Sequence, residues 1–304
     1  MELIIEPLLP FDFSLSAWIF SDGDPRVQRY EGGVYWHALR LGERPVLIEV
    51  RSQGTVDDPR LVARVEPDGL SSSEKEAAKS LVSRIFNLDL DLRPFYRAAK
   101  GDPVMVRIAE RLRGLHSPST ATPFEALIDS ITEQQISLRA AWRMQRKLIE
   151  TFGESLALGG KSHYYYVFPG PERLAAASVE QLRGCGLSGR KAEYVRGVSR
   201  LVADGGALDL EALAGRSEDE IIEALNEIRG IGVWTAEMTM IRGMQKFDAF
   251  PADDLGLRRV ISHYYYEDRR ITGAEARSTA LQWKGWRGLA SFYLIVAEGQ
   301  ELEA

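Results

Sequence analysis

The spacing of hydrophobic residues changes about a third of the way along the chain. Up to about residue 70, short runs of β-branched and aromatic residues are separated by Asp-Gly, Gly-Gly and Gly-Glu pairs, which is typical of strands joined by tight turns. From about residue 102, hydrophobic residues recur at intervals of three and four, which predicts helices. We expect helices at 73–87, 102–113, 123–136, 137–152, 171–183, 188–203, 217–228, 233–243, 254–265 and 288–298.

This change of pattern predicts an α+β fold in two parts. A strand-rich α+β domain with an antiparallel sheet and helices is expected at 1–92, followed by an all-α part at 93–304. A chain of 304 residues is long enough for two domains. It contains no hydrophobic run long enough to span a membrane, and its first residues lack the basic region of a signal peptide. We therefore expect a cytoplasmic protein with no membrane partner.

Charge and cysteine content limit the kinds of site that the chain can build. The net charge of −6 argues against capture of a polyanion through overall positive charge, but not against a local site made of backbone N–H groups. The single cysteine, Cys185, excludes an internal disulfide and any cysteine-rich metal cluster. Basic residues gather on the predicted helix 188–203, where Lys191 is expected to face phosphate if this helix borders a polyanion.

The segment 225–260 contains the most informative motif, a Gly-Ile-Gly turn directly before a helix. Gly230 and Gly232 have no Cβ and let the backbone approach an anion, while the following helix directs free N–H groups to the same place. Thr235 could add its N–H and its hydroxyl, and Ile228 and Ile231 would anchor the turn to the core. An ordinary helical hairpin with a glycine C-cap has the same local pattern, so the turn alone does not decide between the two.

Two aspartates follow 22 residues downstream of the hairpin and change this balance. Either could cap the helix that starts there, and N-capping is the expected role of Asp253. A carboxylate at a helix N-terminus is favoured in its ionised form, which suits the stabilisation of a developing cation. Because phosphate repels carboxylate, a protein that keeps both together is expected to act chemically on the bound polyanion.

Five strings now suggest a family. In order and spacing they resemble the helix-hairpin-helix DNA glycosylases, most closely the 3-methyladenine DNA glycosylase II (alkylation-repair) family. They are PFEALIDSITEQQIS at 123–137, GLSGRKAEYV at 186–195, IRGIGVWTAEM at 228–238, DAFPADDLGLRR at 248–259 and WKGWR at 283–287. The resemblance covers more than half of the chain, and the strand-rich front is similar only in pattern to the α+β domain of longer members.

The resemblance implies a DNA repair enzyme that acts alone and needs no cofactor. Its partner would be double-stranded DNA with a damaged base of the N3- or N7-alkylpurine type. The base would be flipped out of the duplex and released by hydrolysis of the N-glycosidic bond, in a cleft between helical subdomains. Two alternatives stay open: a glycosylase for oxidised or other damaged bases on the same scaffold, and a non-catalytic protein that binds distorted DNA.

Family residues can be transferred to positions in this chain. The catalytic aspartate falls on Asp254, and the hairpin contacts with DNA fall on Gly230, Gly232 and Thr235. The residue that fills the space left by the flipped base falls on Gln135, which without the family would be taken for a solvated residue at a helix end.

Further positions concern the base, the phosphates and an ion. Trp234 and Met238 are expected to line the base pocket, although a tryptophan here is also typical of a core, and Lys191 is expected to contact DNA. Family hairpins often hold a sodium or potassium ion on backbone carbonyls. In this chain those carbonyls belong to Asn226, Ile228 and Ile231.

The chain departs from the family pattern at three places. Members that also cleave the DNA strand carry a lysine two residues after the last hairpin glycine; here this residue is Trp234, so we expect base removal without lyase activity. Arg229 replaces a common proline and could add a phosphate contact. Ile295 and Val296 stand where some members have aromatic pocket residues, whereas Phe292 and Tyr293 are expected in the core. These aliphatic residues leave the range of damaged bases open.

Overall fold

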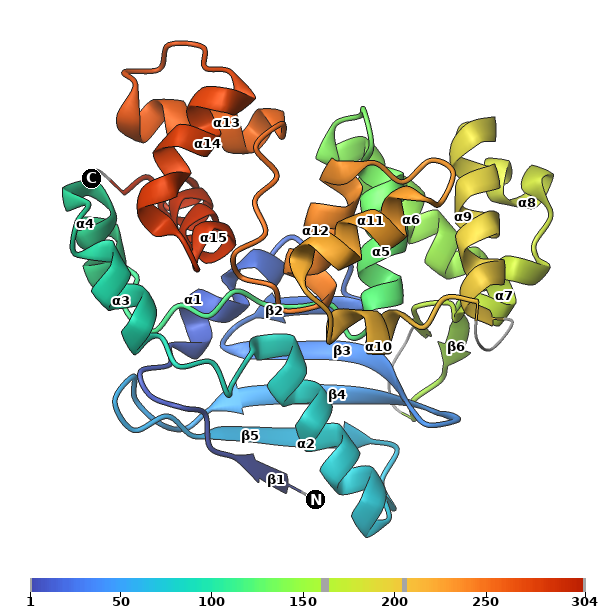
Figure 1. Ribbon diagram of the computed structural model, residues 1–304. Helices are drawn as coiled ribbons and strands as arrows, with labels where there is room; N and C mark the ends of the chain where they lie inside the picture. The colour runs from blue at the N-terminus through green and yellow to red at the C-terminus, as the bar shows by residue number, and fades with distance from the viewer. Residues whose placement is uncertain (1, 160–163, 204–206, 303–304) are drawn as a thin grey trace.

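An antiparallel sheet of five strands forms the base of the N-terminal part. The structure is a computed structural model that describes residues 2–159, 164–203 and 207–302 (Figure 1). The strands follow the spatial order β1-β5-β4-β3-β2, and all neighbours are antiparallel, as predicted. They are β1 (Glu2–Ile5), β2 (Gln28–Glu31), β3 (Val34–Leu41), β4 (Arg44–Ser52) and β5 (Leu61–Glu66).

The longest N-terminal helix, α2 (Ser72–Phe86), packs against one face of this sheet. Its start is fixed by a capping box, in which Ser71 accepts from the N–H of Glu74 and the Glu74 carboxylate accepts from the N–H of Ser71. Tyr35 and Ile48 lie in the same hydrophobic core as the buried side of α2. The short helices α1 (Phe13–Ala17) and η1 (Trp18–Phe20) complete this part of the chain.

On the opposite face of the sheet, a second, two-stranded sheet packs against β3 and β4. Its strands, β6 (Glu154–Leu156) and β7 (Tyr165–Val167), come from the helical part of the chain and pair antiparallel. Ala38 and Leu47 pack against it, because successive residues of a strand point to opposite faces. The expected all-α part therefore also contains two strands of three residues each, too short to leave a periodic pattern in the sequence.

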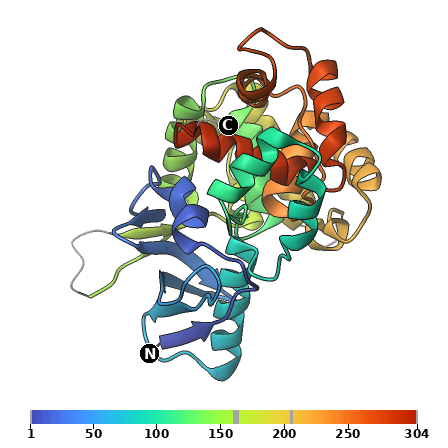
Figure 2. The same cartoon turned by 90° about the vertical axis from the view of Figure 1, so that its left-hand side faces the viewer.

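Helices build the rest of the molecule and lie at one end of the main sheet in both views (Figure 1, Figure 2). The predicted helix 171–183 is two helices, because a capping box at Ser178 and Gln181 starts a new one. Three helices, α3, α10 and α14, were not expected. The helices are α3 (Arg93–Ala99), α4 (Pro103–Arg111), α5 (Pro123–Glu133), α6 (Leu138–Phe152), α7 (Pro171–Ala176), α8 (Val179–Gly184), α9 (Gly189–Ala203), α10 (Leu210–Ala214), α11 (Glu218–Asn226), α12 (Val233–Gly243), α13 (Leu255–Tyr265), α14 (Gly273–Ala280), η2 (Leu281–Trp283) and α15 (Arg287–Gly299).

The helices enclose two separate hydrophobic cores. One core is built from α5 to α12 and ends at Ala249. The other joins α3 and α4 to α13, α14 and α15, and it begins again at Phe250. The chain therefore passes from one helical lobe to the other just before Asp254. The core of the N-terminal sheet ends at Leu88, and Leu92 already belongs to the second helical core.

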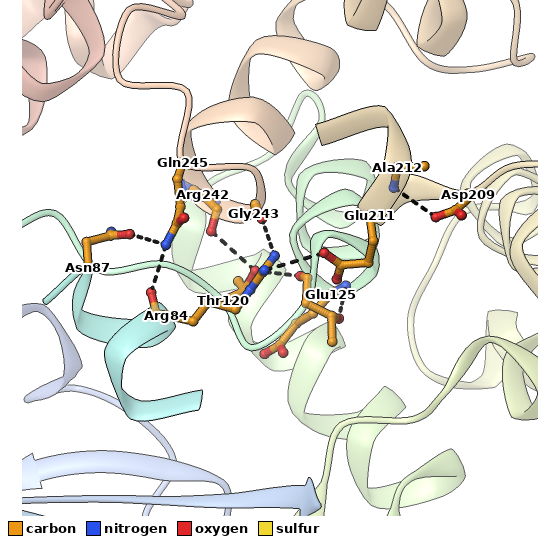
Figure 3. Close-up of polar contacts among 11 residues, drawn as sticks. Arg84, Asn87, Thr120, Glu125, Asp209, Glu211, Ala212, Arg242, Gly243 and Gln245 are labelled. Atoms are coloured by element: carbon orange, nitrogen blue, oxygen red, sulfur yellow. Dashed lines mark hydrogen bonds and ion pairs between the residues drawn. The ribbon is translucent and has the colours of Figure 1, made fainter. Parts of the chain in front are cut away.

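Polar contacts join α2 to the end of α12 (Figure 3). Arg84 donates from Nη2 to the carbonyl of Gly243 at 2.7 Å, and Gln245 donates from Nε2 to the carbonyl of Arg84 and to the side chain of Asn87. Since α12 starts at the Gly-Ile-Gly turn, the N-terminal domain supports the far end of the helix that carries the candidate site. Among the described residues, no helix is both long and apolar enough to cross a membrane.

Candidate functional site

The turn between α11 and α12 has two glycines with different roles. Gly230 has φ +93°, and a Cβ added to it would lie 2.4 Å from the ring of Tyr194, so both backbone and space require glycine. Ile231 is buried and Ile228 packs against the same core, as predicted. Gly232, the N-cap of α12, is exposed, and a Cβ added there would meet no described atom within 4 Å. The surface at Gly232 is therefore open to a ligand.

The start of α12 presents backbone donors beside this open surface. The first intrahelical bond runs from the N–H of Ala236 to the carbonyl of Gly232 at 3.0 Å. The N–H groups of Val233, Trp234 and Thr235 precede it and have no acceptor within the helix. Together with the positive end of the helix dipole they form an anion-binding arrangement.

Gln134 fastens the end of α5 to this turn. Its Nε2 donates to the carbonyl of Gly230 at 2.9 Å and to the hydroxyl of Thr235 at 3.0 Å. Thr235 is only 2% exposed, so its hydroxyl serves this internal contact and not a ligand, unlike the expectation. The sequence reasoning had not singled out Gln134.

Gln135 follows directly and is exposed in a left-handed conformation with φ +55°. Such a conformation is uncommon for a residue with a side chain, and it occurs often at functional sites. Because Gln134 is fixed to the hairpin, Gln135 is displayed next to the hairpin donors.

Asp254 accepts two hydrogen bonds, one within its own helix and one from the other helical lobe. As the N-cap of α13, it accepts the N–H of Leu257 on Oδ1 at 2.8 Å. Its Oδ2 accepts the indole N–H of Trp234 at 3.0 Å. The Asp254 side chain is half-buried. Its partner Trp234 lies on α12, two residues after Gly232. The structure thus brings the carboxylate and the hairpin together.

Asp253 differs from the expectation, because it does not cap α13. Its side chain is 74% exposed and lies 3.7 Å from Nη2 of Arg277 on α14. The turn explains the exchange of roles: the N–H of Asp254 bonds the carbonyl of Pro251 at 2.9 Å, which places Asp254 in the capping position.

Glu237 is a buried acid at this site that the sequence reasoning missed. It is 6% exposed, and its Oε1 lies 3.6 Å from Nη1 of the same Arg277. Burial raises the pKa of Glu237 to about 7, although Arg277 lowers it. Arg277 therefore connects α12 with the turn that carries Asp253 and Asp254. On an amphipathic helix, an isolated glutamate gives no signal of such burial.

Trp234 and Met238 are one turn apart on α12, so they share a face of the helix. Both are half-buried, which leaves part of each side chain accessible, and Trp234 contacts Asp254. Their role in a base pocket stays a prediction. Of the two aliphatic positions on α15, Ile295 is 41% exposed, whereas Val296 is fully buried and lines no pocket; Phe292 and Tyr293 lie in the core as expected.

The placement of Lys191 corrects the prediction that it contacts DNA. The residue is 8% exposed, and its ammonium donates to the carbonyl of Thr132 at 2.8 Å, at the C-terminal end of α5. Burial lowers the pKa of Lys191, and the charge of Glu133 acts in the opposite direction. A cation at a helix C-terminus satisfies free carbonyls and the dipole. Lys191 therefore serves the packing of α9 on α5.

The remaining hairpin predictions concern Arg229 and the ion site. The Arg229 side chain is 80% exposed and lies 3.4 Å from Glu193, so its charge is at the surface. Of the three carbonyls predicted to hold an ion, that of Ile228 accepts the N–H of Ile231 at 3.0 Å and keeps a second lone pair. The ion site at these carbonyls stays a prediction.

Comparisons with known proteins agree with this geometry. Residues 128–285 match the HhH-GPD superfamily of base excision DNA repair proteins. The chain is 30% identical to a DNA-3-methyladenine glycosylase of Bacillus subtilis over 96% of both chains, and 28% identical to DNA-3-methyladenine glycosylase 2 of Escherichia coli over 95% of both.

One solved structure has a similar fold over nearly the whole length of this chain. The 3-methyladenine DNA glycosylase from Archaeoglobus fulgidus is 28% identical, with a TM-score of 0.84 over 99% of this chain and 100% of that chain. The similarity thus includes the N-terminal sheet as well as both helical lobes. The protein belongs to the HhH-GPD superfamily of base excision DNA repair proteins.

Proposed function

We propose that this protein is a DNA glycosylase that removes alkylated purines from double-stranded DNA by hydrolysis of the N-glycosidic bond. The observation that carries the proposal is the Asp254 carboxylate, held by the N–H of Leu257 and the indole of Trp234 beside the open hairpin surface. The names of the full-length relatives, which are 3-methyladenine glycosylases, support the same substrate class.

DNA binding begins at the hairpin. A backbone phosphate near the lesion accepts hydrogen bonds from the N–H groups at the start of α12, at the open surface beside Gly232. The damaged nucleotide rotates out of the duplex, which costs a few kcal/mol and is cheapest for a poorly paired base. Gln135, exposed next to the hairpin, fills the space that the base leaves.

Bond cleavage then depends on Asp254. The bond between C1′ and the base nitrogen breaks, its electron pair leaves with the base, and a cationic alkylated base becomes neutral. The carboxylate stabilises the positive charge that develops on the sugar. Water adds to C1′ and releases a proton to solvent, which leaves an abasic site. A cationic base over the face of Trp234 would gain about 0.5–2 kcal/mol over a neutral base.

The proposal includes the absence of strand cleavage. A lyase reaction needs an amine that attacks C1′, and the position that carries this amine in bifunctional relatives holds Trp234, whose indole N–H already bonds Asp254. A sodium or potassium ion on the carbonyls of Asn226, Ile228 and Ile231 is a further part of the proposal. It would rigidify the hairpin and take no part in bond cleavage.

The test is to identify the released bases. Methylated duplex DNA is incubated with the wild type and with Asp254→Asn, and freed bases are identified by mass spectrometry. We expect methylated purines from the wild type and at least about 100-fold slower release from the variant, with similar DNA binding. If neither protein frees a base while both bind, the protein is a DNA-distortion binder. A covalent adduct after borohydride treatment would contradict the absence of lyase chemistry.

A further inference from the structure

A pocket of about 280 Å³ lies on the exposed side of α13, next to Asp254 in the chain. The loop that connects α13 to α14 forms its other wall, at the top of Figure 1. Leu255, the residue after Asp254, lines the pocket and is 71% exposed. The pocket therefore opens beside the start of the helix that Asp254 caps.

The pocket is strongly basic in a chain whose net charge is −6. Its lining includes Arg258, Arg259, Arg269 and Arg270, against one acidic residue, Asp268. Such a concentration in an acidic protein creates a local positive potential that overall charge does not supply.

Two of the four arginines are already neutralised. Arg259 pairs with Glu298 on α15, with Nη2 and Oε2 at 2.6 Å. Arg269 pairs with Glu275 at 2.7 Å and its guanidinium lies over the ring of Tyr266. No carboxylate in the described part of the chain pairs with the other two.

The free pair, Arg258 and Arg270, thus adds a charge of two to the pocket, of which Asp268 offsets one. Arg258 also has a buried Nε–H with no acceptor among the described residues. An unsatisfied buried donor is unfavourable, and a bound acceptor would satisfy it. The guanidinium fork matches the paired oxygens of a phosphate.

The position along α13 relates this pocket to the proposed reaction. Arg258 lies four residues after Asp254, which is about 6 Å along a helix axis. Successive phosphates of one strand are about 3.4 Å apart along the duplex axis, so an anion at Arg258 would be within about two nucleotides of the sugar at Asp254. The hairpin donors approach Asp254 from α12, through Trp234, whereas the pocket belongs to α13.

We propose that this pocket is a second phosphate-binding site, in which Arg258 and Arg270 hold a backbone phosphate of the damaged strand on the α13 side of Asp254. This inference rests on the proposed function. The two phosphate sites would grip the strand on both sides of the flipped nucleotide and keep the sugar opposite the carboxylate.

The experiment measures how salt weakens DNA binding. Each phosphate contact adds about 0.9 to the slope of log affinity against log salt concentration. Binding of duplex DNA with a stable abasic-site analogue is measured by fluorescence anisotropy at several salt concentrations, for the wild type, Arg258→Gln, Arg270→Gln and the double variant. Arg60→Gln is the matched control, because it removes the same charge from an exposed position of the N-terminal domain.

We expect each pocket variant to lower the slope by about 1 and to weaken binding about 3- to 10-fold near 0.1 M salt, with an additive double variant and an unchanged control. An unchanged slope overturns the proposal, whether or not binding is weaker. Weaker binding with the original slope would mean that the arginines act through the fold. Gly232→Val separates this failure from failure of the proposed function. If it weakens binding while the pocket variants do not, only the pocket is wrong; if none weakens binding, the proposed function fails as well.

Discussion

Two groups of carboxylates in this protein have opposite surroundings. On α5, Glu125, Asp129 and Glu133 are spaced four residues apart and therefore share one side of the helix. Glu125 and Glu133 are 5% and 9% exposed. In contrast, Asp254 is half-buried at the start of α13, and Asp253 beside it is exposed. The first group faces the interior and the second faces the candidate site.

The α5 acids are strongly perturbed by burial. Burial raises the pKa of Glu125 to about 7, and it raises the pKa of Asp129 well above its ordinary value, with further help from the charges of Glu125 and Glu133. Arg242 on α12 compensates this group through a hydrogen bond to Glu133 at 2.6 Å. These three acids, which we call the α5 stripe, thereby fasten α5 to α12.

A shifted pKa does not by itself mark a functional carboxylate. Ion pairs that serve packing shift pKa values as active sites do. What distinguishes Asp254 is its contacts: two N–H donors fix its oxygens beside an open anion-binding surface. Glu237 lies between the two types, since it is buried like the α5 acids but borders the turn of Asp253 and Asp254 through Arg277.

Removal of Arg242 tests the structural role of the α5 stripe and should have the largest effect on stability. Arg242→Met leaves Glu133 buried without its partner, which should cost about 3–4 kcal/mol of unfolding free energy. Urea unfolding measures this loss. Arg216→Met is the matched control, because Arg216 and Glu220 are 67% and 55% exposed and such a pair contributes about 0–1 kcal/mol. Equal losses in both variants would contradict the role assigned to the stripe.

The pH dependence of stability tests whether Glu237 is held in its neutral form in the folded protein. Its folded pKa of about 7 lies above its ordinary value of 4.5, so the folded state holds the proton more tightly and loses stability as pH rises between these values. Glu237→Gln cannot ionise. At 1.36 kcal/mol per pKa unit, the variant should gain up to about 3 kcal/mol relative to the wild type between about pH 5 and pH 8. Urea unfolding at both pH values measures it; a constant difference would mean that Glu237 is not held in its neutral form.

The two hairpin glycines provide a smaller, paired test. Gly230→Ala forces a methyl group against Tyr194 at a positive φ, so it should cost about 1–3 kcal/mol of stability. Gly232→Ala meets open space at φ −102° and should change stability by less than about 1 kcal/mol. Thermal unfolding and DNA binding measured together separate the two positions. If Gly232→Ala binds DNA as tightly as the wild type, phosphate does not approach the backbone there.

The features that the sequence predicts correctly depend on residues close together in the chain. The turn requires glycine at Gly230 because its φ is positive, and one of the two aspartates caps the helix that follows directly, although the cap is Asp254 and not Asp253 as expected. The change from period two to periods of three and four separates the strands from the helices for the same reason. Local chemistry therefore reveals the hairpin and the carboxylate before any tertiary contact is known.

The features that the sequence does not predict depend on partners far away in the chain. Lys191 reads as one of several basic residues on a helix, but its ammonium meets a carbonyl 59 residues earlier. Arg277 and Glu237 meet across the two lobes, and the basic pocket needs the loop after α13 to fold back on Arg258. The spacing of hydrophobic residues along the chain gives no signal of such long-range contacts.

Base release is expected to depend most directly on Asp254, and its neighbour Asp253 offers a matched control. Base release from a single defined alkylated duplex is followed under single-turnover conditions for Asp254→Asn and Asp253→Asn, which remove the same charge one residue apart. We predict a rate at least about 100-fold lower for Asp254→Asn, as for the loss of an electrostatic stabiliser of the transition state. Asp253→Asn should stay within about threefold of the wild type, because its carboxylate is exposed and lies beside Arg277, whereas the indole of Trp234 bonds Asp254. Equal rates for the two variants would contradict the claim that the Asp254 carboxylate drives cleavage of the glycosidic bond.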